Sequence, residues 1–432
     1  MANYINKLSD KNIFYVTVFF SATLLVDYKY YIILISVLVI SLIQTRDNLF
    51  FSNNHLTFRT IPIFFYIVEV TKFLLNKNKE TIFWDMQLFL FRIKCNLDWS
   101  SHYRYKFTSE KIECTELGFG PAINFFKFDL DAWLFSIIIF FAFLILLFYF
   151  LFKLSGMDLL IVAYFLVTPS FYFLMQSLNH DIFFLTLFTF LFRNYKIYNN
   201  IIFLTFLTFL TLFKIYSIGI FFGIFLFLIS SKNLRENFKF LFVFILNLSL
   251  LVNYYFSNNI SVPSPISKIY SFGVFHDFNL IKNTSLLMSQ IFILFYVLCI
   301  FYILFNSDKI FHVFFNKLLF KSNQEKFNTI VFTSLVLLIL IYSNYGYKYV
   351  NIIFTLLIVL KYVNKKFTFP IITSVVFIPL NYFVGNQFQN SIYEILLFSL
   401  SRISFYFLHF LVILLFIKFL KSYVLKQDNK LY

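Results

Sequence analysis

The stretch LFSIIIFFAFLILLFYFLF, residues 134–152, decides the fold class of this chain. It carries no charge and is about as long as a helix that crosses a bilayer. A second long and mostly apolar run covers residues 396–420. Backbone polar groups in lipid must be hydrogen-bonded within their own segment, so such runs must form helices. The sequence therefore predicts an all-α, polytopic integral membrane protein.

The composition supports the same fold class. Hydrophobic residues make up 60% of the 432 residues and charged residues 13%, which excludes an ordinary soluble domain. The net charge of +16 is expected from basic residues that gather in cytoplasmic loops. The sequence has no soluble basic segment interleaved with aromatic residues, which is the pattern that would predict nucleic-acid binding. We expect residues 1–432 to form a single transmembrane domain.

The basic residues also predict a topology. Loops rich in Lys and Arg alternate with charge-poor loops, and the positive-inside rule places the basic loops in the cytoplasm. The loops on the outer side are then 77–132, 176–181, 214–216, 257–288, 343–348 and 386–395. This pattern predicts about 11 to 14 transmembrane helices and a long first extracytoplasmic loop. The apolar runs that form the expected spans include those near residues 13–26, 29–44, 182–193, 200–213 and 289–306.

Two polar segments of the predicted outer face contain candidate functional residues. Trp84-Asp85-Met86-Gln87 opens the long loop, where the carboxylate of Asp85 can serve as a general base or bind a divalent cation. The alternative is an acid at a helix end without a chemical role. Asn179-His180-Asp181 lies between two apolar runs, where ionisable groups are costly to bury and are often functional. The alternative is a solvated turn with Asp181 at a helix N-terminus.

Other outer segments offer cations. Lys214 lies at the tip of a predicted hairpin within 201–229, beside Tyr216, and a lysine there can bind a phosphate. A lysine that extends to the headgroups is the alternative. The loop 257–288, which includes His276, either lines a sugar or phosphate pocket or is merely solvated. The cluster 344–348 adds Lys348.

The chain has three cysteines. Cys299 lies inside an apolar run and is expected to be a packing residue. Cys95 and Cys114 share the long polar loop, where an extracytoplasmic location permits a disulfide. Whether they are paired stays open from the sequence.

The polar segments, taken in order, resemble those of GT-C fold glycosyltransferases, in particular the bacterial polyprenyl-phosphate-dependent branch that includes membrane mannosyltransferases. Trp84-Asp85-Met86-Gln87, Cys114 and Gly118-Phe119-Gly120-Pro121 resemble the first external loop of that family. Asn179-His180-Asp181 stands where the family tends to have Gly-Asn-x-Asp. Phe213-Lys214-Ile215-Tyr216-Ser217 resembles its Lys-x-Tyr-Pro segment, and Asn344 to Lys348 resembles Asn-x-Asp-Tyr-Arg. The departures from the pattern are Leu178, Ser217 and the Gly346-Tyr347-Lys348 element.

The resemblance implies a GT-C-like bundle that moves a sugar from a polyprenyl-phosphate donor to a glycan or lipid acceptor. The active site would face the periplasm or exterior of a bacterial inner membrane. Asp85 would be the catalytic base, with the donor phosphate bound by Lys214, Tyr216, Lys348 and His276. The acceptor would be bound, or Asp85 oriented, by Gln87, Asn179, His180 and Asp181. No cofactor is expected. A divalent cation occurs in the wider fold family, but the sequence indicates no second carboxylate near Asp85, so a metal is not favoured.

Two other functions fit a polytopic chain. A surface-polysaccharide polymerase or ligase also uses lipid-linked sugars, but it would favour arginine in external loops. The outer loops after residue 132 contain lysine but no arginine. A transporter or flippase of lipid-linked glycans predicts ionisable residues at mid-membrane depth. Glu394 and Arg402, near the last span, favour that alternative.

Overall fold

The computed structural model of the chain describes most residues from position 83 onward and few before it. The described residues are 63, 66–67, 71, 83–95, 97, 102–104, 111–113, 127, 129–154, 162, 166, 169–179, 181–213, 215–231, 237–257, 271–272, 274–316, 320–341, 344–345, 351–364, 366–367, 370–371, 374, 378 and 392–424. Membrane spans expected near residues 13–26 and 29–44 lie outside this set.

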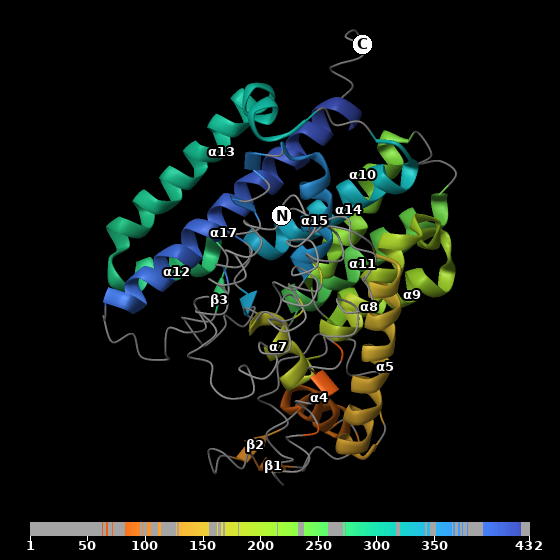
Figure 1. Ribbon diagram of the computed structural model, residues 1–432. Coiled ribbons are helices and arrows are strands. Elements are labelled where there is room, and N and C mark those ends of the chain that lie inside the picture. The colour runs from red at the N-terminus through yellow and green to blue at the C-terminus, as the bar shows by residue number, and fades with distance from the viewer. Residues whose placement is uncertain are drawn as a thin grey trace, which may run out of the picture. The chain divides into compact units, whose positions relative to one another are not determined.

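Helices form nearly all of the described secondary structure (Figure 1). The α-helices are α4 (Trp84–Lys94), α5 (Ala132–Phe152), α7 (Pro169–Ser177), α8 (Asp181–Arg193), α9 (Ile201–Phe213), α10 (Ile218–Ser230), α11 (Phe238–Ser257), α12 (Val274–Thr284), α13 (Leu286–Phe314), α14 (Asn323–Ile341), α15 (Ile352–Tyr362) and α17 (Ile392–Phe419). Short helical turns are η6 (Tyr195–Asn199), η7 (Ile215–Ser217) and η11 (Leu420–Val424). Two short antiparallel strand pairs join β1 (His102–Arg104) to β2 (Lys111–Glu113), and β3 (Ser271–Phe272) to β4 (Asn344–Tyr345).

Four of the described helices are long and apolar enough to cross a membrane. They cover Ala132–Phe152, Leu286–Phe314, Asn323–Ile341 and Ile395–Tyr423. Such helices fit an integral membrane protein and confirm the helical membrane class predicted from the sequence. The total number of spans and the GT-C arrangement stay predictions.

The chain folds into two compact units. Unit 1 comprises Met1–Gln87, Ala132–Ile182 and Phe369–Phe405. Unit 2 comprises Leu88–Asp131, Phe183–Thr368 and Tyr406–Tyr432. Both units are assembled from segments far apart in the sequence.

Aromatic side chains form the core of unit 1. Phe83, Phe140 of α5 and Phe171 of α7 are fully buried. The ring of Phe83 lies 5.3 Å from that of Phe140, and the ring of Phe171 lies 6.4 Å from that of Phe143. These contacts attach the segment before α4 and the helix α7 to the same face of α5.

In unit 2, α10 packs tightly against α14. A Cβ atom added at Gly223 would lie 2.5 Å from the Cα of Val331, and one at Gly219 would lie 2.8 Å from the Cα of Leu335. Small residues four positions apart let helices in membranes approach this closely. The order of these contacts is reversed between the two helices, so α10 and α14 are antiparallel.

The start of α14 satisfies the last backbone groups of α8. The side chain of Gln324 accepts a hydrogen bond from the backbone N–H of Tyr195 at 2.7 Å and donates to the carbonyl of Phe192 at 2.9 Å. Asn328 donates to the same carbonyl at 2.7 Å. The last carbonyl groups of a helix have no partner within the helix. Side chains of α14 provide that partner here.

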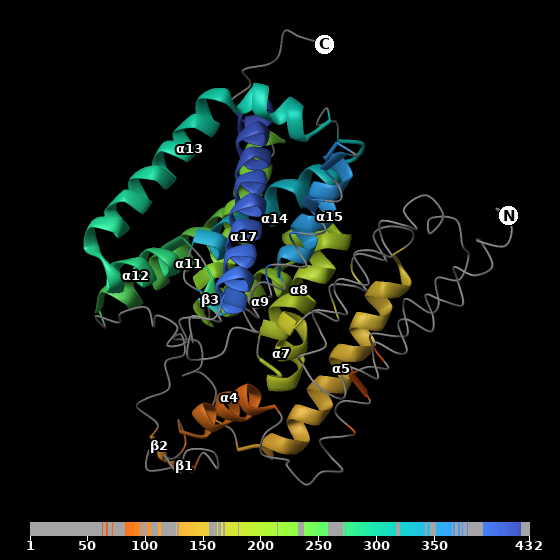
Figure 2. The same cartoon turned by 60° about the vertical axis from the view of Figure 1, so that its left-hand side comes forward.

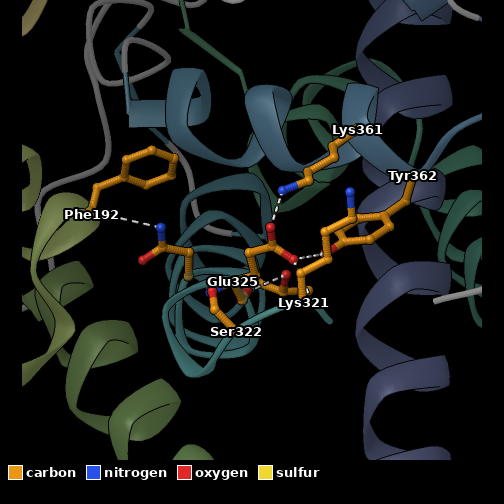
Figure 3. Close-up of polar contacts among 8 residues, drawn as sticks. Phe192, Lys321, Ser322, Glu325, Lys361 and Tyr362 are labelled. Carbon is orange, nitrogen blue, oxygen red and sulfur yellow. Dashed lines mark hydrogen bonds and ion pairs between the residues drawn. The ribbon is translucent and has the colours of Figure 1, made fainter. Parts of the chain in front are cut away.

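Glu325 joins the start of α14 to the end of α15. Lys361 and the hydroxyl of Tyr362 both donate to its carboxylate, and Figure 3 shows the two side chains pointing toward it from α15. The backbone N–H of Lys321 donates to the same carboxylate at 2.8 Å. Ser322 accepts from the backbone N–H of Glu325 at 3.2 Å, as the N-cap of a capping box does.

Segments predicted to share one membrane face lie together in unit 2. The ion pairs Lys361–Glu325 and Lys418–Asp308 connect the end of α15 to the start of α14, and the end of α17 to the end of α13. The sequence assigns all four of these helix ends to the cytoplasmic side. Likewise, β3 and β4 come from two predicted outer loops and pair with each other. These contacts support the predicted alternation of loops.

Candidate functional site

The candidate site in unit 1 is built on a hydrogen bond between Asp85 and Asn179. The side-chain amide of Asn179 donates to Oδ2 of Asp85 at 2.5 Å. Asp85 lies in the first turn of α4 and is half-buried, whereas Asn179 is 2% exposed. A helix N-terminus stabilises a carboxylate in its ionised form, as does a donated hydrogen bond. The arrangement therefore holds the carboxylate of Asp85 in a fixed orientation.

Asn179 is placed by the way α7 ends. The backbone N–H of Asn179 donates to the carbonyl of Leu174 at 3.1 Å, and that of Leu178 donates to the carbonyl of Met175 at 3.3 Å. Leu178 has φ of 47°. This is a Schellman motif, in which the residue after the helix adopts the left-handed conformation and glycine is favoured. Leu178 stands at the position where the resembled family tends to have glycine.

The segment before Asp85 is anchored beside the same turn. The backbone N–H of Phe83 donates to the carbonyl of Gln176 at 2.8 Å, and Phe83 has φ of 61°. Phe83 and Leu178 are the two non-glycine residues with positive φ among the residues that the structure describes. Both are fully buried. Such conformations persist only where the surroundings enforce them, and they cluster at functional sites.

Asp181 is held by the same amide group. Its backbone N–H donates to Oδ1 of Asn179 at 3.0 Å, and its side chain is 2% exposed in the first turn of α8. The expectation that no second carboxylate lies near Asp85 stays a prediction. Asn179 connects the carboxylate of Asp85 to the backbone of Asp181. The sequence could not reveal this, since Asp85 and Asn179 are 94 positions apart. In the described part of the chain, no group of three or more His, Cys, Asp or Glu side chains could hold a metal ion.

The remaining candidates of this segment are placed only in part. Gln87 lies in the first turn and a half of α4, half-buried, and its backbone N–H donates to the carbonyl of Phe83 at 3.0 Å. His180 lies outside the described residues. The structure thus brings together Asp85, Asn179 and Asp181 of the predicted set.

The predicted donor-binding residues belong to unit 2. Tyr216 lies in η7 and is 5% exposed, with its ring 5.3 Å from that of Phe184. His276 lies in the first turn of α12, and its side chain is not described. Lys214 and Lys348 lie outside the described residues. The donor-binding role of all four stays a prediction.

The cysteines divide into two kinds. Cys95 is disulfide-bonded, and Cys299 is a free thiol. Cys114 lies outside the described residues, so the Cys95–Cys114 pair stays a prediction.

The sequence did not predict two polar pairs, one between α12 and α17 and one between α13 and α17. The hydroxyl of Tyr406 donates to Oδ2 of Asp277 at 2.7 Å. The hydroxyl of Tyr296 lies 2.7 Å from Nε2 of His409, which is fully buried within α17. The signal in the sequence was a histidine inside an otherwise apolar run, because an ionisable residue within a membrane span is a functional candidate.

Comparisons of the chain with protein-family models, with curated proteins and with solved structures find no match.

Proposed function

We propose that the chain is a membrane glycosyltransferase that moves a sugar from a polyprenyl-phosphate donor to a glycan or lipid acceptor. The observation that carries the proposal is the Asp85–Asn179 hydrogen bond, flanked by two buried residues with positive φ. The order of the polar segments along the sequence supports it as well. In this proposal the site faces the extracytoplasmic side of a bacterial inner membrane.

Asp85 acts as the general base of the reaction. It takes the proton of the acceptor hydroxyl while that oxygen forms a bond to the anomeric carbon of the sugar. The bond from this carbon to the phosphate oxygen breaks, and the polyprenyl phosphate leaves with the electron pair. Attack and departure occur on opposite faces of the sugar, so the configuration inverts.

The other site residues orient the base or bind the donor. Asn179 fixes one oxygen of Asp85, while the backbone N–H of Asp181 fixes the orientation of the amide. Cationic and hydroxyl groups of the predicted donor-binding set stabilise the charge that develops on the leaving phosphate. The residues assigned to this role are Lys214, Tyr216, Lys348 and His276.

The test is sugar transfer in reconstituted vesicles. Radiolabelled polyprenyl-phosphate sugars are mixed with a membrane glycolipid extract, and transfer by the wild type is compared with that by Asp85→Asn. We expect Asp85→Asn to abolish transfer and to leave folding intact, because it removes the base and keeps the shape of the side chain.

Asp129→Asn is the matched control. Asp129 forms an exposed ion pair with Lys94 at 3.0 Å, and such pairs contribute little to stability. This variant is expected to transfer sugar like the wild type. Full activity of Asp85→Asn would remove Asp85 as the base.

A transporter or flippase of lipid-linked glycans is a second candidate. The observation that favours it is the Tyr296–His409 pair, which places an ionisable group inside the apolar part of α17. The same vesicles separate the two functions. Label that crosses the bilayer while attached to its lipid, equally in the wild type and in Asp85→Asn, indicates a flippase.

A further inference from the structure

Helix α13 of unit 2 is attached to the rest of the unit by few apolar contacts. Only 11% of its apolar stretch is buried, against 67% for that of α14. Figure 2 shows α13 as a long helix at the edge of unit 2, with α12 at its lower end. From residue 297 to 306, Ile303 is the buried side chain. Packing along this stretch therefore provides little attachment, and ring contacts with α17 lie outside it, as between Tyr296 and Phe410 at 6.2 Å.

Polar contacts attach α13 to the 406–419 part of α17 at two levels. At the first level, Tyr296 contacts His409 at 2.7 Å. At the second level, Lys418 donates to Asp308 at 2.8 Å, and Lys421 donates to the hydroxyl of Ser307 at 2.6 Å. The stretch between the two levels has mostly exposed or half-buried apolar side chains.

The backbone departs from helical geometry at one point inside α13 and at the residue that precedes it, and both can serve as hinges. Asn306 has φ of −105° and ψ of 15°, and its side-chain amide donates to the carbonyl of Tyr302 at 3.1 Å. A bend therefore occurs there without leaving that carbonyl unsatisfied in lipid. At the other end, Ser285 is extended and caps the helix by accepting from the backbone N–H of Met288.

We propose that α13 is a lateral gate. Its segment between the hinges at Ser285 and Asn306 moves away from α17 and lets the polyprenyl chain of the donor pass from the bilayer. This inference rests on the proposed function, because it assumes a lipid-carried substrate. Lipid chains are as apolar as the side chains that they would replace, so separation of the helices loses little apolar contact. It does break the Tyr296–His409 hydrogen bond. That bond is the latch, and the open form is a minor state.

The test measures opening directly by fluorescence. Cys299 on α13 carries a bimane label, and Phe410→Trp on α17 supplies a quencher beside Tyr296, whose ring lies 6.2 Å from that of Phe410. Tyr296→Phe removes the hydroxyl of the latch and keeps the ring. We expect its unquenched fraction to rise roughly three- to tenfold, as the loss of one interhelical hydrogen bond allows. The proteins are measured in lipid nanodiscs. Adding polyprenyl phosphate to these nanodiscs is expected to raise the unquenched fraction of the labelled protein that retains Tyr296.

Tyr302→Phe is the matched control, because Tyr302 is 64% exposed on the same helix. It should quench like the wild type, and circular dichroism confirms that each variant is folded. Unchanged quenching in Tyr296→Phe overturns the latch, and no response to polyprenyl phosphate overturns the lipid passage. The measurement needs neither sugar nor acceptor. Absence of sugar transfer in the wild type would therefore refute the proposed function without altering this result.

Discussion

At the scale of single residues, Asn179 has two separable roles. Its amide nitrogen orients Asp85, and its carbonyl oxygen accepts from the backbone N–H of Asp181 at the start of α8. Asn179→Ala should lower transfer by about 10- to 100-fold, because a misplaced base loses the reactive geometry. It should also lower the free energy of unfolding by about 1 kcal/mol, the usual loss for a helix cap. Vesicle transfer and thermal unfolding in detergent measure the two effects.

The control is Asn179→Ser, which keeps a short acceptor for the backbone but no amide donor for Asp85. We expect it to recover most of the lost stability and little of the lost activity. Equal activity of Asn179→Ala and the wild type would show that Asp85 needs no orientation by this amide.

Leu178 adopts a conformation that favours glycine, yet Leu178→Gly should destabilise the protein. The left-handed conformation costs a non-glycine residue about 1–2 kcal/mol. Leu178 is fully buried, however, and deletion of a buried leucine side chain costs about 3–5 kcal/mol. The burial outweighs the strain, so we expect a net loss of about 1–4 kcal/mol. A higher unfolding temperature of Leu178→Gly would contradict this account.

At the scale of helices, the contact between α10 and α14 depends on Gly223. A Cβ atom there would lie 2.5 Å from a backbone atom of Val331, so Gly223→Ala must push the two helices apart. Overpacking of this kind costs about 1–3 kcal/mol. The better helix propensity of alanine offsets about 1 kcal/mol of this. We expect a lower unfolding temperature for Gly223→Ala, and a smaller change for Phe222→Ala, since Phe222 is 43% exposed on the same helix. Stabilisation by Gly223→Ala would show that the helices separate without cost.

The extent of α13 shows where prediction from sequence fails at this scale. The apolar run predicts a helix that ends near residue 306, whereas α13 continues to Phe314. The polar residues that interrupt the run, Ser307 and Asp308, are bound by Lys421 and Lys418 of α17. In contrast, α8 and α9 match the predicted spans 182–193 and 200–213 within one residue, because polar residues bound those runs at both ends.

At the scale of the whole molecule, the predicted topology can be tested by labelling. The part of α13 before the bend at Asn306, residues 286–305, is about 30 Å long, which matches a hydrocarbon core of about 30 Å. Lys282 precedes it and Lys321 follows it, and both are exposed. In a Cys299→Ser background, Lys282→Cys should react with a membrane-impermeant maleimide on intact cells. Lys321→Cys should react only after permeabilisation, and the background chain alone is the control. Labelling of both from one side would contradict the topology.

The helical membrane class could be predicted from the sequence, but the contacts among the candidate site residues could not. Long apolar runs specify helices by themselves, and charged loops specify which helix ends lie together. The Asp85–Asn179 contact instead depends on how two distant segments pack on α5, which no local pattern encodes. His409 was missed for a related reason, because its partner Tyr296 comes from another apolar run.

The capping of α8 by α14 has a consequence for how the chain is made. α8 has 13 residues and is about 20 Å long, too short to bring both of its ends to water across a bilayer. The carbonyl of Phe192, in the last turn of α8, accepts hydrogen bonds from Gln324 and Asn328. These two residues are synthesised more than a hundred residues later. We therefore expect α8 to reach its final position in the membrane only after α14 has been synthesised.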